Sequence, residues 1–321
     1  MSLNPEITSR IEKLEEKSAS MGQDLKSYLD GLLYADYLTY WDYIHLDNLL
    51  SLQNPKTKIP DESIFIMYHQ ITELYFKLCM HEMNQLSENQ QVVVGDILKA
   101  LTRVNRYFDA LIDSFDIMVD GMDPKQFHQF RMSLLPASGF QSGQYRMLEI
   151  YATDFKNLMV IDNRSSFGSP QNEAEVEKMF EHIYWKQGAT ELATGKKTLT
   201  LIQFEEKYAT ELLDLAKKCR TKNIWALVAA LPESDRNSEA LVNALKQLDV
   251  NINVNWPLSH YKSAVRYLQR DPEDIAATGG TNWQKYLPPR FQKRIFYPTL
   301  WSTEELDNWG KNWVRSVVFN K

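Results

Sequence analysis

Apolar residues recur at helical spacing along most of this chain. The clearest predicted helix runs from Asp61, which can cap it, to about Gln90. Its apolar positions follow a 3.6-residue repeat through Ile64, Met67, Tyr68, Ile71, Leu74, Tyr75 and Leu78. The same periodicity predicts helices over residues 92–119, 141–158, 173–186, 198–220, 234–249 and 257–270, and a last helix from about residue 303. Because alternating patterns are scarce and no internal repeat occurs, the sequence predicts an all-α fold.

Two segments differ from this helical pattern. Residues 1–30 are rich in charge and permissive for helix, so we expect an N-terminal helical arm followed by a single all-helical domain over 31–321. Residues 163–172 hold the only plausible internal break, and we expect 160–250 to be an inserted or peripheral helical region. Residues 34–50 are unusually aromatic, and a helix there would expose an oily face that needs cover from a core, a ligand or another subunit.

Composition narrows the class of protein. The 321 residues are 44% hydrophobic and 24% charged, which is enough for a large core. A net charge of −6 with scattered basic residues argues against a nucleic-acid partner. Cys79 and Cys219 are the only cysteines, so neither a disulfide framework nor a cysteine zinc site is supported, and a reducing cytoplasm is expected. The charged N-terminus does not resemble a signal peptide, and no run approaches the ~20 apolar residues of a membrane span.

The segment from Phe130 to Arg146 carries a dense mixture of polar side chains. It lies between two helical regions and contains Pro136 and Gly139, so it should be a loop that enters a helix. Its arginines, glutamines, serines and aromatics are typical of a place where polar groups converge on a bound molecule. The alternative is a buried inter-helix loop whose arginines satisfy carbonyls and carboxylates. Composition alone leaves both interpretations open.

Several common catalytic motifs are missing from the sequence. It contains no GxSxG, HExxH, GxGxxG or P-loop motif, and no Glu-x-x-His pair of the kind found in di-iron bundles. A lone helical histidine is more often structural, but His69 is flanked on its helix face by Phe65 and Phe76, as a polar group in an apolar pocket would be. Isolated histidines in an aromatic-rich helical chain also suit a haem pocket, in which one imidazole binds the iron. The six candidates are His45, His69, His81, His128, His182 and His260.

Four stretches, taken in order, resemble one known family. The loop reads Phe130-Arg131, then Leu135-Pro136-Ala137-Ser138-Gly139-Phe140-Gln141-Ser142, then Gln144-Tyr145-Arg146, and it is similar to the signature loop of the tryptophan 2,3-dioxygenase family. Tyr40 to Asp47 resembles an N-terminal segment of that family, and Phe65 to Lys77 resembles its histidine-bearing helix. Trp256 to His260 with Thr278-Gly279-Gly280 resembles the stretch that carries its haem ligand. The middle of the chain, about 160–250, is not matched in this way.

The resemblance implies a haem site with a distal side for the substrate. His260 would be the proximal ligand of the haem iron, and His69 would hydrogen-bond the indole nitrogen on the distal side as the catalytic histidine. Phe65 would pack on the indole ring, and Ser138 and Gly139 would border the distal haem face.

The resemblance also implies how the amino-acid part of the substrate is held. Arg131 would clamp the carboxylate, for which a planar guanidinium is suited. Thr278 would bind the ammonium group, and Phe127 would wall the pocket. Tyr40, Tyr43 and Ile44 match residues that family members donate from a neighbouring subunit of a homotetramer, which would explain the aromatic segment.

The expected activity is therefore insertion of both atoms of O2 across the indole C2–C3 bond of L-tryptophan by ferrous haem b, giving N-formyl-L-kynurenine. Some positions differ from the family pattern, since residues 271–277 look inserted and Tyr75 stands where a tryptophan is usual. Other possibilities are a same-fold haem enzyme that adds one oxygen atom to a substituted tryptophan or a kynurenine, a non-catalytic haem sensor, and a helical interaction protein without haem.

Overall fold

The computed structural model describes residues 4–36, 38–134, 141–189, 196–268 and 289–310. It divides the chain into two units, Met1–Asn54 and Pro55–Lys321. Regular structure in the described ranges is helical, with no strand among them, and an isolated antiparallel bridge joins Met159 to Ile183. The predicted all-α class is therefore confirmed. None of the helices in those ranges is both long enough and apolar enough to cross a membrane.

The described part of the N-terminal unit contains four helices. They are α1 (Pro5–Ser20), α2 (Leu25–Leu33), α3 (Tyr40–Tyr43) and α4 (Leu46–Leu50). Their described residues include no buried side chain, and the exposed fractions of Leu33 and Tyr34 reach 81% and 84%. Helices normally depend on tertiary packing for much of their stability, so this unit has apolar surface to cover. The arm boundary predicted at residue 30 stays a prediction.

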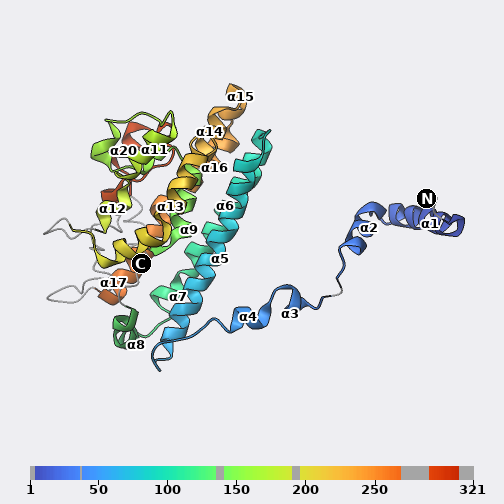
Figure 1. The fold of residues 1–321 in the computed structure, drawn as a ribbon, viewed down its shortest axis with the longest axis horizontal. Coiled ribbons are helices and arrows are strands. Elements are labelled where there is room, and N and C mark those ends of the chain that lie inside the picture. The colour runs from blue at the N-terminus through green and yellow to red at the C-terminus, as the bar shows by residue number, and fades with distance from the viewer. Residues whose placement is uncertain (1–3, 37, 135–140, 190–195, 269–288, 311–321) are drawn as a thin grey trace. The chain divides into compact units, whose positions relative to one another are not determined.

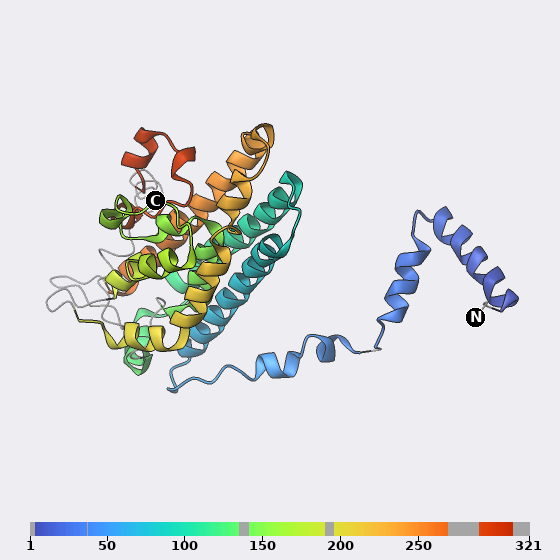
Figure 2. The ribbon, with the colours of Figure 1, turned by 45° about the horizontal axis from the view of Figure 1, so that its top comes forward.

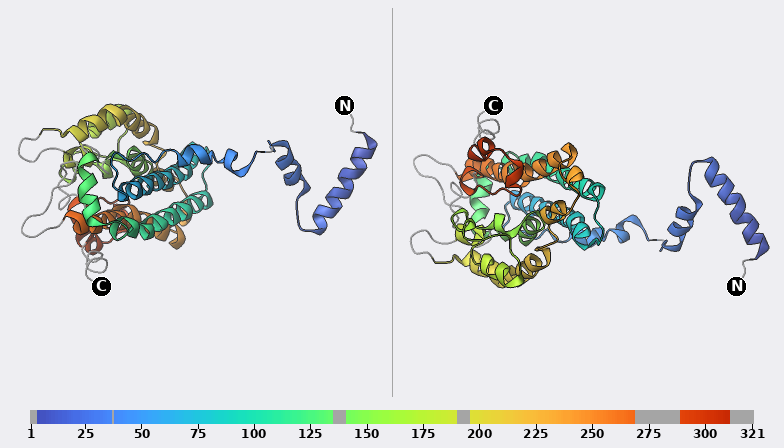
Figure 3. Two further views of the ribbon diagram at one scale, coloured as in Figure 1. Left: turned by 90° about the horizontal axis from the view of Figure 1, so that it is seen from below. Right: turned by 90° about the horizontal axis from the view of Figure 1, so that it is seen from above.

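Five helices form the framework of the second unit. They are α5 (Asp61–Glu88), α6 (Val94–Ser114), α9 (Gly143–Ala152), α13 (Leu199–Cys219) and α16 (Glu239–Val250). α5 packs between α6 and α9, α16 lies on the far side of α6, and α13 lies on the far side of α9 (Figures 1 and 2). The views from below and from above in Figure 3 show α13 and α16 on opposite sides of α5. The centre of the packing is fully buried, with Leu101, Phe108 and Leu111 of α6 at 0% exposure.

The other described elements connect and cover this framework. The elements that come between α6 and α9 in the chain are α7 (Asp116–Val119), α8 (Pro124–Phe130) and the 3-10 turn η1 (Arg131–Leu134). α16 continues through the π-helical turn η4 (Asn251–Asn255) into α17 (Trp256–Leu268). The others are η3 (Phe155–Leu158), α10 (Ile161–Arg164), α11 (Glu173–Phe180), α12 (Tyr184–Gly188), α14 (Ile224–Ala229), α15 (Glu233–Arg236), α19 (Pro289–Gln292), η5 (Pro298–Leu300) and α20 (Thr303–Asp307).

The predicted helices exist, but several are divided. The helix expected over 141–158 ends at Ala152, because Thr153 adopts extended backbone angles and its hydroxyl donates to the carbonyl of Phe296. The helix expected over 92–119 is interrupted at Phe115. The helices expected over 234–249 and 257–270 are instead joined, without a loop, by the π turn. The last helix begins at Thr303 as predicted.

Candidate active site

Two histidines from different helices meet in the interior of the second unit. His69 lies in the middle of α5, and His260 lies one turn into α17. Burial lowers the pKa of His260 to about 4, and the nearby imidazole of His69 lowers it further. The ring of Phe115 connects the two helices, since it packs on His260 of α17 and on Tyr68, the neighbour of His69 in α5. Burial also lowers the pKa of His69, so both imidazoles are neutral at pH 7.

Each histidine is fixed by a carbonyl of its own helix. Nδ1 of His69 lies 2.7 Å from the carbonyl oxygen of Phe65, and Nδ1 of His260 lies 3.0 Å from that of Trp256. In a neutral imidazole, a nitrogen that faces a carbonyl oxygen must carry the proton and donate it. The Nε2 atom of each ring is therefore left with a lone pair. On His260 that lone pair could bind a metal, and on His69 it could accept a hydrogen bond.

Aromatic rings surround both histidines. The His260 ring lies 4.6 Å from the ring of Phe115 and 4.5 Å from that of Trp256, measured between centroids. Phe115 is only 5% exposed and comes from the break between α6 and α7. Sequence reasoning missed this residue, because an apolar residue on an amphipathic helix gives no sign that it faces a site. Apolar walls of this kind suit a large flat cofactor such as haem.

A continuous row of rings runs from His69 toward the far end of α17. The His69 ring lies 4.1 Å from that of Phe65, which is 5.8 Å from Phe130. Phe130 is 5.6 Å from Phe127, which is 4.7 Å from Tyr267 of α17. The predicted pocket residues Phe65 and Phe127 therefore lie in one aromatic row with His69. Their individual roles stay predictions.

Arg131 enters this region directly after Phe130. It closes the C-terminus of α8 by donating its backbone N–H to the carbonyl of Phe127, and its residue surface is 5% exposed. A planar guanidinium at this position has the donor geometry that suits recognition of a carboxylate. Thr278, Ser138 and Gly139 lie outside the described residues.

The aromatic residues predicted to come from another subunit lie in the N-terminal unit. Tyr40 and Tyr43 belong to α3 and are 70% and 74% exposed, and Ile44, which ends that helix, is 36% exposed. The backbone turns sharply at His45, whose φ of 52° is left-handed. The side chains of α3 are thus available for contact with a partner.

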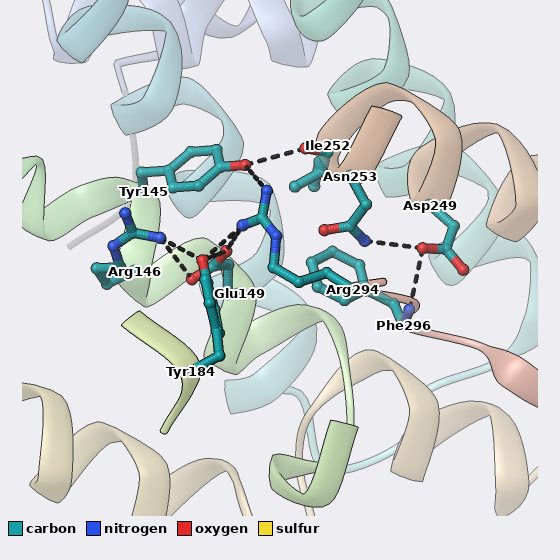
Figure 4. Close-up of polar contacts among 9 residues, drawn as sticks. All are labelled: Tyr145, Arg146, Glu149, Tyr184, Asp249, Ile252, Asn253, Arg294 and Phe296. Atoms are coloured by element: carbon teal, nitrogen blue, oxygen red, sulfur yellow. Dashed lines mark hydrogen bonds and ion pairs between the residues drawn. The ribbon is translucent and has the colours of Figure 1, made fainter. Parts of the chain in front are cut away.

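The second arginine of the signature loop has a different environment from the first. Arg146 of α9 donates to Glu149 over 3.1 Å, and the hydroxyl of Tyr184 donates to the same carboxylate over 2.5 Å (Figure 4). Arg294 also pairs with Glu149 and donates to the hydroxyl of Tyr145 over 3.3 Å. Burial raises the pKa of Tyr184 well above its usual value. Arg146 therefore fits the alternative in which the loop is a buried connection between helices, because its guanidinium pairs with the buried carboxylate of Glu149.

Other metal or thiol chemistry has little support in the described ranges. No group of three or more histidine, cysteine, aspartate or glutamate side chains gathers there in a way that could hold a metal ion. Cys79 and Cys219 are both buried, and burial raises the pKa of each thiol, that of Cys219 to about 11. A single imidazole facing an apolar space, as His260 does, is a donor set suited to haem iron.

Comparison with known proteins points to one family. A family model described as tryptophan 2,3-dioxygenase matches residues 31–183. The tryptophan 2,3-dioxygenase of Bacillus cereus (strain ZK / E33L) is 39% identical over 293 residues, which cover 88% of this chain and 98% of that protein. The protein of the same name from Polaromonas naphthalenivorans (strain CJ2) is 35% identical over 286 residues, covering 89% and 96%. A third, from Ruegeria sp. (strain TM1040), is 43% identical over 117 residues, which are 36% of this chain and 42% of that protein.

Proposed function

The chain belongs to the tryptophan 2,3-dioxygenase family, and we propose that it is an oxidoreductase that uses haem and O2 to cleave the indole C2–C3 bond of L-tryptophan, giving N-formyl-L-kynurenine. The observation that carries the proposal is the pair of neutral histidines, His69 and His260, that share an aromatic interior. Both oxygen atoms enter one substrate, so the reaction needs no external reductant.

His260 is the residue that would hold the iron of haem b. Its Nδ1–H donates to Trp256, as a backbone carbonyl commonly orients a metal-binding imidazole, and Nε2 is left for the metal. The rings of Phe115 and Trp256 provide apolar surface beside it. When bound in the ferrous state, haem supplies the chemistry that activates O2. The remaining tasks fall to the protein, which must orient the indole, exclude water and bind the amino-acid group.

The distal tasks belong to His69 and the aromatic row. Because its Nδ1 proton is held by Phe65, His69 offers Nε2 as an acceptor for the indole N–H. Phe65 and Phe127 would form the flat walls against which the indole packs, and their rings keep water away from it. A neutral histidine can accept this bond without the desolvation cost of a buried cation, which the lowered pKa of His69 favours.

The amino-acid end of the substrate would be held by two further groups. The guanidinium of Arg131 can bind a carboxylate through two parallel N–H donors, which also fixes its orientation. The hydroxyl of Thr278 would accept a hydrogen bond from the ammonium group. Ser138 and Gly139 would border the distal haem face. These assignments rest on the match between the chain and its family together with the burial of Arg131.

The subunit arrangement we propose is a homotetramer in which the N-terminal unit packs on a neighbouring subunit. Tyr40, Tyr43 and Ile44 would then close the neighbour's pocket. The supporting fact is that the described residues of this unit carry much exposed apolar surface and no buried side chain. Sedimentation of the full chain tests this assembly, and an active monomer would exclude it. A Tyr43→Ala variant should keep haem and lose affinity for L-tryptophan.

The haem assignment is tested by comparing two histidine variants. His260→Ala should lose most haem and all oxygenase activity. His182→Ala should keep both, since His182 is exposed and its Nδ1 bonds only the surface residue Asn163, over 2.8 Å. Absorption spectra with and without dithionite and CO measure haem, and the absorbance of N-formylkynurenine measures activity. Equal haem content in the two variants would contradict the role of His260.

The same assay separates the competing functions. A protein that binds no haem would be an interaction protein, and one that binds haem but oxidises no indole or kynurenine would be a sensor. A reduced, haem-replete protein that spares L-tryptophan and adds one oxygen atom to a substituted tryptophan or a kynurenine would be the related monooxygenase. The inserted residues 271–277 are the feature that favours this last possibility over the other two.

A further inference from the structure

The helix that carries His260 does not begin as an ordinary helix. α16 runs into α17 through the π turn of residues 251–255, where the backbone N–H of Trp256 donates to the carbonyl of Asn251, five residues earlier. π turns are rare, and they frequently mark functional sites. This one ends five residues before the proposed iron ligand.

The π turn changes the direction in which His260 points. An α-helix turns by about 100° per residue. If residues 239–268 formed one uninterrupted α-helix, His260 would lie about 90° away from the buried stripe of Leu245 and Leu248 on α16. A turn with hydrogen bonds five residues apart advances by only about 82° per residue, so five such residues remove about 90°. The π turn therefore rotates His260 back onto the side that α16 buries.

Side-chain hydrogen bonds from three elements hold the turn in this form. On one side, Asn251 donates from Nδ2 to Asp109 of α6 over 3.0 Å. On another, the hydroxyl of Tyr145 on α9 donates to the carbonyl of Ile252 over 2.9 Å (Figure 4). Asn253 donates to Asp249 of α16 over 2.8 Å. Asn251, Ile252 and Asn253 are at most 1% exposed, and the bonds of Ile252 and Asn253 are buried, whereas that of Asn251 reaches the exposed carboxylate of Asp109.

We infer that Tyr145 and Asn251 are positioning residues for the iron ligand: by holding the π turn they set the rotation of His260 toward His69. The inference rests on the proposed function, because it matters only if His260 binds haem iron. Neither residue is expected to touch haem or substrate. Loss of their hydrogen bonds should let the segment relax toward α-helical geometry, which turns the imidazole away from the iron.

The test compares two tyrosines of the same helix. Tyr145→Phe removes the hydroxyl that binds the π turn, whereas Tyr151→Phe removes the hydroxyl of a tyrosine that is 5% exposed, against 7% for Tyr145, and that donates to Asn84 over 2.9 Å. The readout is the iron–histidine stretching band in the resonance Raman spectrum of the ferrous full-length protein, together with haem affinity. We expect Tyr145→Phe to shift or split the band and to weaken haem binding at least threefold, and Tyr151→Phe to match the wild type.

A second set of variants tests Asn251 by exchange. Asn251→Asp places a carboxylate against Asp109 and should disturb the band, whereas Asp109→Asn keeps an acceptor and should not. The double variant Asn251→Asp/Asp109→Asn reverses the direction of the hydrogen bond and should restore the band. If Asn251→Asp does not fold, the two tyrosine variants decide the question by themselves.

The possible results separate this inference from the function on which it rests. A wild-type protein without an iron–histidine band, or a band that survives His260→Ala, means that the proposed haem site is wrong. If that band depends on His260 but Tyr145→Phe leaves it unchanged, the positioning role is wrong and the haem site stands. Equal shifts in Tyr145→Phe and Tyr151→Phe would also overturn the role, because they would reflect only the weakening of α9.

Discussion

Glu149 is the carboxylate on which a buried cluster of charges depends, and Glu149→Gln should destabilise the fold strongly. Its side chain is 1% exposed and pairs with Arg146 and Arg294, whose side chains are 10% and 8% exposed. Wild-type charges sum to +1 from two guanidinium groups and one carboxylate. The variant raises this to +2 and turns an amide NH2 group toward a donor. Removal of one partner from a buried ion pair typically costs about 3–5 kcal/mol.

A second glutamate provides the matched control. Glu82 pairs with Arg103 over 2.9 Å, but the Arg103 side chain is 44% exposed, so solvent can take over its charge. Glu82→Gln should therefore cost only about 0–1 kcal/mol. The two changes share their chemistry and differ in the burial of the partner.

Urea unfolding followed by far-ultraviolet circular dichroism measures both variants. With an m-value of about 3 kcal/mol/M, the loss expected for Glu149→Gln lowers the midpoint by roughly 1 M or more. Adding Arg294→Met returns the buried charge to +1, so the double variant should lose less than the sum of the two single losses. Equal midpoint shifts for Glu149→Gln and Glu82→Gln would refute the reasoning, because burial of the arginines would then have no energetic consequence.

Two further predictions concern substrate binding and pH. Arg131→Ala should raise the Michaelis constant for L-tryptophan at least about tenfold more than His69→Ala does. The reason is that loss of a charge-assisted bidentate pair costs several kcal/mol, whereas loss of a neutral hydrogen bond costs about 1 kcal/mol. Steady-state assays measure both constants, and equal values for the two variants would contradict the prediction. Burial raises the pKa of Asp249 to about 6 from the 3.8 expected when unfolded. The folded state therefore binds the proton of the Asp249 carboxyl more tightly than the unfolded state does. The contribution of Asp249 to the free energy of unfolding is largest below pH 3.8, and it falls by about 3 kcal/mol as the pH rises through 6. Unfolding midpoints measured between pH 4 and 7 should fall along that slope. Asp249→Asn should remove the slope, whereas Asp162→Asn, which changes an exposed carboxylate, should keep it.

Helices were predictable from the sequence where local pattern decides them. The stripe of apolar residues along Asp61–Glu88 is set by the 3.6-residue period, and the helix lies within two residues of where that period indicates. The end of α9 was not predictable, because the hydroxyl of Thr153 and the amide of Asn157 both bind the carbonyl of Phe296, well over a hundred residues later. Only the folded chain brings those groups together.

The part of the candidate site around His69 was easier to predict from the sequence than the part around His260. His69 and Phe65 are one helical turn apart, so periodicity alone puts them in contact. The approach of His260 to His69 depends on how α17 is rotated, which the π turn decides, and sequence patterns do not indicate a π turn. Arg131 and Arg146 look alike in the signature loop, and the sequence pattern did not indicate that Arg146 would pair with the buried carboxylate of Glu149. That pairing depends on how α9 packs in the folded chain.

Asp249, a buried carboxylate of α16, anchors the end of that helix to the C-terminal segment. It accepts hydrogen bonds from the backbone N–H groups of Phe296 and Tyr297 and from the indole of Trp301, all on that segment. These bonds fix α16 directly before the π turn begins. His260, by contrast, meets mainly aromatic rings, which favour its neutral form. A neutral imidazole is what iron binding requires, so this aromatic environment suits the proposed role of His260.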